Sequence, residues 1–148
     1  MLCGTNDVDA ILNIKRTMYS NVHINSDNID MLKFNQSVDD IQNLIHFMQY
    51  WSKGATINIF NLLPRGSIHR NKVINKINYF LRNSCSLINS LNFIDTEYGV
   101  NLFSESNGYR KSIYFKQYGT DNVHLNMSGV VRFGRHIKYL MHLDCPRK

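Results

Sequence analysis

The spacing of apolar residues changes between helical and strand periods along the chain, and these changes predict the order of its elements. A first helix is predicted from Ser37, an N-cap residue followed by Asp39 and Asp40, whose charges favour a helix start. Lys53-Gly54 ends it. Its apolar residues fall at intervals of three and four, as one helix face requires: Ile41, Leu44, Ile45, Met48 and Trp51.

The rest of the chain continues with strands and helices in turn. A strand is predicted over residues 56–61, before Pro64, and a second short strand over 91–95. A helix over 69–90 lies between them, with an apolar stripe formed by Val73, Ile74, Ile77, Phe80, Leu81 and Ile88. A last helix starts near Ser128, with an inner side predicted to comprise Val131, Ile137, Leu140 and Met141.

The remaining segments give weaker signals. Met1-Leu2-Cys3 is typical of the end of an apolar strand, whereas residues 8–36 are predicted to be irregular, with weak helical signals around Ile11 and Met31. Residues 96–120 are predicted to form a long loop. Strands that alternate with helices are typical of an α/β fold with a parallel sheet, so we expect one domain over residues 1–148.

Composition restricts the location and the cofactors of this protein. No run of about 20 apolar residues is present, so no transmembrane segment is expected. The N-terminus lacks the basic and apolar regions of a secretory signal. Three scattered cysteines do not suggest a disulfide framework, which favours an intracellular (cytoplasmic) location. His142 and Cys145 have the types of zinc ligands but no second half of a site, so neither metal nor cofactor is expected.

The net charge of +6 and the pI near 9.3 leave two interpretations open. An excess of positive charge favours an anionic partner such as nucleic acid. Scattered charges without interleaved aromatic residues favour an ordinary solvated surface. The densest basic cluster comprises Arg132, Arg135, Lys138, Arg147 and Lys148.

Two polar segments lie next to predicted elements, at positions where catalytic or binding residues are expected. Gly4-Thr5-Asn6-Asp7 directly follows the first strand, and Asp121 to Asn126 directly precedes the last helix. Ligands of open α/β sheets bind beyond the carboxyl ends of the strands, and both segments are predicted to lie near that edge. Taken alone, each segment is more typical of a turn or of the surface.

Together, the two segments supply most of what acyl transfer needs. His124 has the chemistry of a general base, and Asp121, three residues earlier, could orient the imidazole. Asn6 could donate its side-chain amide to an oxyanion, and Gly4 permits a close backbone approach. The two segments resemble conserved blocks of the SGNH (GDSL) hydrolases, a family of serine esterases.

The resemblance covers nearly the whole chain. Gly4-Thr5-Asn6-Asp7 is similar to the family's Gly-x-Asn-Asp block, which assigns Asn6 to the oxyanion hole with Gly4 and Asp7 in support. Asp121 and His124 match the Asp-x-x-His block of the triad, and Leu125-Asn126 and Gly129 continue the pattern. Asn61-Leu62-Leu63-Pro64-Arg65 and the helix residues Asn71, Asn75 and Asn78 also resemble the family.

The family's nucleophile block is not found in this sequence. Gly-Asp-Ser precedes Gly-x-Asn-Asp in the family, but only three residues do so here, and no Gly-Asp-Ser occurs anywhere. The resemblance implies a flavodoxin-like three-layer parallel sheet, with strand order 2-1-3-4-5 and the first strands missing. We therefore expect an N-terminally truncated ester hydrolase domain that is inactive toward a small-molecule ester.

Two further expectations follow from the missing block. A first strand reduced to Met1–Cys3 would be an exposed edge, so we expect marginal stability, aggregation or completion by a partner chain. The alternative function is that of a non-catalytic binding protein that uses the same fold for an anionic partner such as nucleic acid.

Overall fold

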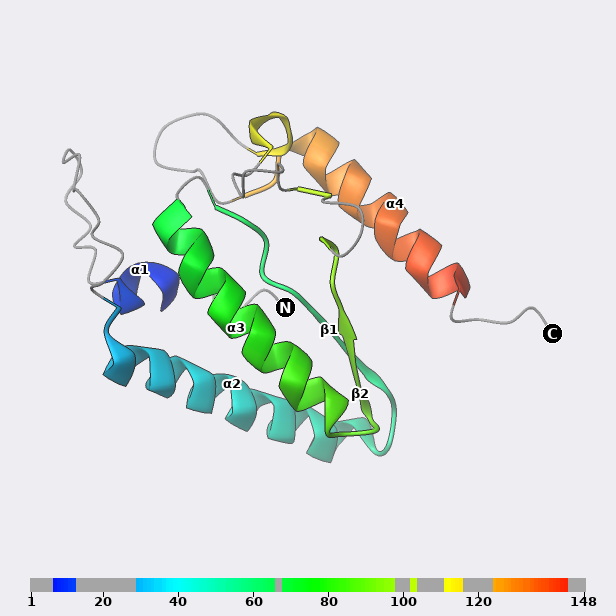
Figure 1. Ribbon diagram of the computed structural model, residues 1–148. Helices are drawn as coiled ribbons and strands as arrows, with labels where there is room; N and C mark the ends of the chain where they lie inside the picture. The colour runs from blue at the N-terminus through cyan, green and yellow to red at the C-terminus, as the bar shows by residue number, and fades with distance from the viewer. Residues whose placement is uncertain are drawn as a thin grey trace.

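The computed structural model describes residues 7–12, 29–65, 68–97, 102–103, 111–115 and 124–143 (Figure 1). In chain order the elements are α1 (Asp7–Ile11), α2 (Met31–Ser52), β1 (Ile57–Phe60), α3 (Ile68–Ser86), β2 (Leu91–Ile94), the 3-10 turn η1 (Ser112–Tyr114) and α4 (Met127–Leu143). None of the described helices is long and apolar enough to cross a membrane.

The two described strands are parallel, as the alternation of elements predicts. β1 pairs with β2 from Ile57 opposite Leu91 to Phe60 opposite Ile94, and α3 connects them. Helices and a parallel sheet in one chain confirm the predicted α/β class. The predicted first strand, Met1–Cys3, lies outside the described residues, so the full strand order stays a prediction.

Helices lie on both faces of this sheet. Successive strand residues point to opposite sides, so each face carries side chains that pack against a helix. Ile57 and Ile59 of β1 pack with Phe93 of β2 against the core that α2 and α3 cover. Phe60 points the other way, and its ring centroid lies 5.7 Å from that of Phe133 on α4. In Figure 1, α2 and α3 accordingly lie on one side of the strands and α4 on the other.

The main core is built from the predicted stripe of α3. Val73 and Ile77 are fully buried, and Ile74 and Leu81 are nearly so, while Phe80 and Ile88 pack around them. Full burial of one such side chain stabilises the fold by about 1.5–3 kcal/mol. Ile45 of α2 and two residues of α1, Val8 and Ile11, also belong to this cluster.

A smaller apolar cluster lies under α4. Phe103 and Phe115 are almost completely buried there, and Leu63, Leu125 and Phe133 pack around them. The ring of Phe103 contacts those of both Phe115 and Phe133, at centroid distances of 6.1 and 6.0 Å. This cluster therefore attaches α4 to Phe103 and Phe115, which lie outside the helices and strands of the sheet.

The predicted start of the first long helix was wrong. α2 begins at Met31, and Asp30 is its N-cap, with a carboxylate that accepts the Lys33 N–H at 3.1 Å. Ser37 therefore lies inside the helix, and Asp39 and Asp40 are not in its first turn. The predicted end is correct: Lys53 is left-handed at φ 49°, and Gly54 follows at φ 87°.

Three other predictions also differ from the structure. The weak helical signals around Ile11 and Met31 are confirmed, since α1 occupies Asp7–Ile11 and α2 starts at Met31, so residues 8–36 are not irregular throughout. α3 ends at Ser86 rather than at Ser90, and the N–H groups of Leu87 and Ile88 then donate to the carbonyls of Ser84 and Cys85, both at 3.3 Å, in a tighter turn. Within the predicted 96–120 loop, η1 forms a short 3-10 turn.

Two predicted core side chains are exposed. Trp51 is 63% exposed at the end of α2, where its ring contacts those of Phe47 and Tyr50 rather than the core. Val131 is 43% exposed on α4, whereas Phe133 turns toward the smaller cluster. Ile137 and Leu140, which were also predicted to face inward, are half-buried and lie four and seven positions after Phe133, so they share its face of α4, and Val131 alone of these three differs from the prediction.

Candidate active site

Asparagine side chains of α3 hold the loop that follows β1. Asn78 accepts the Leu62 N–H at 2.7 Å and donates to the Leu62 carbonyl at 3.0 Å. Asn71 makes the same pair of bonds with Arg65, also at 2.7 and 3.0 Å. Each side-chain amide thus bonds both the N–H and the carbonyl of one loop residue, as a neighbouring strand would do. These bonds fix residues 61–65 although the segment is neither helix nor strand.

The loops after the two strands are also joined to each other. Asn61 is buried at the end of β1, and its side-chain oxygen accepts both the N–H and the hydroxyl of Thr96 at 2.9 Å. Thr96 follows β2 and is fully buried. The carboxyl edge of the sheet, where α/β proteins bind ligands, is therefore braced by buried polar contacts.

An ion-pair cluster fastens α1 to this edge. Asp9 accepts from Arg65 at 3.1 Å and from Arg70 at 2.6 Å. The Arg65 side chain is only 11% exposed, and Arg70 lies in the first turn of α3. Asp7, the last residue of the Gly-x-Asn-Asp segment, is also the first residue of α1. The cluster therefore also fixes the helix that begins at this residue.

His124 lies immediately before α4, as the sequence predicts. Its side chain is exposed, and the next residue, Leu125, forms an antiparallel bridge with Phe115. Asn126 then fixes the helix start: its side-chain oxygen accepts the Gly129 N–H at 2.9 Å. The amide of Asn126 also donates to the carbonyls of Ile113 and Phe115, at 2.7 and 3.2 Å.

Close packing at Gly129 completes this support for His124. A Cβ at Gly129 would collide with the backbone carbonyl of Tyr114 and lie 3.0 Å from Leu125 Cδ2. That carbonyl also accepts the Asn126 N–H at 2.9 Å. The first turn of α4 can therefore lie directly on η1 only because residue 129 has no side chain.

The other predicted site residues are covered only in part. Gly4, Asn6 and Asp121 lie outside the described residues, and for Asp7 only the backbone, at the start of α1, is described. The contact of Asn6 and Asp121 with His124 therefore stays a prediction. Sequence reasoning missed Asp9 and Arg70, because an ion pair between residues 61 positions apart leaves no local pattern.

Comparison with solved structures shows that another protein has a similar fold. A solved structure from Streptococcus pneumonia, described as "a putative platelet activating factor", matches with a TM-score of 0.66 and 17% identity. The match covers 94% of this chain and 56% of that one, so this chain spans little more than half of its length. No protein-family model and no curated protein sequence matches the chain.

Proposed function

We propose that this chain is part of an SGNH-type ester hydrolase domain with a flavodoxin-like sheet. The order of its two polar segments carries the proposal: Gly4-Thr5-Asn6-Asp7 comes at the start and Asp121 to His124 directly before the last helix. The likeness to the Streptococcus pneumonia structure supports the fold part of this proposal. The buried braces along the carboxyl edge supply the rigid frame that a catalytic site requires.

The proposed chemistry is hydrolysis of a small-molecule ester through an acyl-serine. His124 takes the proton of the attacking serine and gives it to the leaving alcohol, while Asp121 orients the imidazole. His124 then takes a proton from the water that attacks the acyl-serine and returns it to the serine oxygen as the acid leaves. Asn6 donates its amide to the oxyanion, with Gly4 and Asp7 shaping the turn around it. The Asn126 cap and the close contact at Gly129 keep the backbone of His124 in a fixed position.

The nucleophile is the part of this mechanism that the sequence lacks. No Gly-Asp-Ser occurs in the 148 residues, so we propose that this chain alone does not hydrolyse esters. Without its serine, a triad retains only the residual catalysis of the oxyanion hole and of substrate binding. Hydrolysis of p-nitrophenyl acetate by the purified chain should equal that of its His124→Ala variant.

A fused chain tests the positive half of the proposal. A strand–helix unit that carries Gly-Asp-Ser, joined before Met1, should create ester turnover and labelling of that serine by a fluorophosphonate. His124→Ala in the fusion should lower turnover about a thousandfold or more. His46→Ala is the matched control, since His46 is exposed on α2, away from the proposed site. Equal activity in the His124 and His46 variants would refute the assignment.

A further inference from the structure

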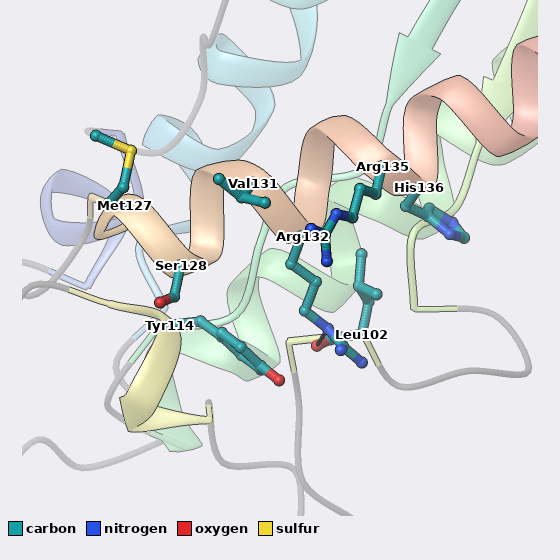
Figure 2. Close-up of a pocket in the computed structure, with 8 residues that line it drawn as sticks. All are labelled: Leu102, Tyr114, Met127, Ser128, Val131, Arg132, Arg135 and His136. Carbon is teal, nitrogen blue, oxygen red and sulfur yellow. Dashed lines mark hydrogen bonds between the residues drawn. The ribbon is translucent and has the colours of Figure 1, made fainter.

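An open pocket of about 650 Å³ lies between α4 and η1. Leu102, Met127 and Val131 give it an apolar wall, and Tyr114, Arg132 and Arg135 line it with polar atoms (Figure 2). Its volume falls in the range of sites for small molecules. A mixed lining of this kind suits a ligand with one apolar and one charged part.

Arg132 is already held in place in this pocket. Its Nε donates to the carbonyl of Leu102 at 3.2 Å, and its guanidinium carbon lies 4.9 Å from the centre of the Tyr114 ring. These contacts orient the planar group and use one of its five N–H donors. The group is therefore pre-oriented, with donors left over for an acceptor.

Arg135 adds a second guanidinium on the same side of α4. It is exposed and three positions further along the helix, and Figure 2 shows it on the pocket side beside Val131 and Arg132. No carboxylate among the described residues lines the pocket. Within the described part of the chain, two cationic groups and no carboxylate give this surface an excess of positive charge.

The arginines at the edge of the sheet differ in this respect. Arg65 and Arg70 both pair with Asp9, and Arg82 pairs with Asp95. Arg132 and Arg135 take part in none of the ion pairs found among the described residues. Among the described residues, Arg65, Arg70 and Arg82 are thus neutralised by carboxylates, whereas Arg132 and Arg135 lie beside an apolar wall.

We propose that this pocket binds a small phosphomonoester that carries an apolar group. The phosphate, with nearly two negative charges, matches the two guanidinium groups of Arg132 and Arg135. The apolar group lies on Leu102, Met127 and Val131. Of the described residues assigned to ester hydrolysis, none lines this pocket, so the proposal does not rest on the ester hydrolase proposal.

Calorimetric titration of the purified chain with phenyl phosphate tests the proposal. Arg135→Gln should raise the dissociation constant about tenfold, the usual effect of losing one charge-assisted contact. Lys138→Gln is the matched control, because Lys138 is exposed on the same helix and does not line the pocket. That control removes the same charge and should leave the constant within about twofold. Arg135 is exposed and takes part in none of the ion pairs found among the described residues, so the main variant should melt like the parent chain.

Inorganic phosphate and a short DNA duplex are the comparison ligands. Inorganic phosphate should bind several-fold more weakly than phenyl phosphate, because it leaves the apolar wall in water. Absence of phenyl phosphate binding at millimolar concentration would overturn the proposal, as would equal affinity for the two phosphates. Equal weakening in the Arg135 and Lys138 variants, or DNA binding that both variants weaken alike, would instead indicate a general basic surface.

Discussion

Single residues determine whether the start of α4 can support His124, and Gly129 is the most demanding of them. We expect Gly129→Ala to lower the free energy of unfolding by about 1–3 kcal/mol, because its Cβ would overlap the Tyr114 carbonyl. Gly134→Ala on the same helix is the control. No atom lies within 4 Å of a Cβ placed there, so alanine should stabilise the chain by about 0.5–1 kcal/mol. Urea unfolding measures both values, and equal effects would refute the packing argument.

Cys85 allows a second test at the scale of one residue. It is buried on α3, and burial raises the pKa of its thiol. The raised pKa means that this group's contribution to stability is fully present below the ordinary thiol pKa. It is lost as the pH rises through the folded value. With Cys3 and Cys145 replaced by serine, the folded chain should react slowly with iodoacetamide, and urea should make the reaction fast. Rapid reaction in the folded chain would contradict the burial.

Among the elements, the attachment of α1 depends on Asp9. Asp9→Asn leaves Arg65, which is largely buried, without its carboxylate, so we expect a loss of about 1–3 kcal/mol in unfolding free energy. Arg82→Gln is the comparison variant, because Arg82 is half exposed in its pair with Asp95 and its loss should cost under about 1 kcal/mol. Chemical unfolding of both variants tests whether Asp9→Asn loses more unfolding free energy than Arg82→Gln. A smaller loss for Asp9→Asn would show that α1 is held by apolar contacts alone.

The sequence predicted the interior elements better than the ends and loops. The stripe of α3 was predicted correctly because burial repeats at helical spacing. The start of α2 was placed too late because Asp30 and Ser37 are both N-cap residue types, and the weak helical signal around Met31 did not decide between them. On α4, Val131 was placed inward and Phe133 overlooked, since the smaller cluster depends on Leu102 and Phe103 from a distant loop.

The candidate site was only partly predictable for a related reason. His124 was correctly placed before the last helix. Asn71 and Asn78 were singled out in the sequence as helix residues that resemble the family, but their hydrogen bonds were not predicted. Their role, bonding the backbone of Leu62 and Arg65, depends on how α3 lies beside the loop. Local spacing does not encode such tertiary contacts.

For the whole molecule, the edges of the sheet have a consequence for stability. Within the described part of the chain, β1 pairs with β2 alone, so the outer edge of each strand has no strand partner there and is open to pairing with another chain. We therefore expect a low melting temperature or self-association of the isolated chain, measured by circular dichroism together with light scattering. A cooperative transition at high temperature in a monomer would contradict this expectation.

The central claim is that Asn6 and His124 face one cleft at the carboxyl edge of the sheet, and cross-linking tests it most directly. The measurement uses an Asn6→Cys, His124→Cys chain in which Cys3 and Cys145 are serine, treated with a short bismaleimide and analysed by mass spectrometry. We predict an intramolecular cross-link in this chain and none in an Asn6→Cys, Lys53→Cys control, because Lys53 precedes the opposite end of β1. Absence of the 6–124 cross-link, or equal yields in both chains, would contradict the account.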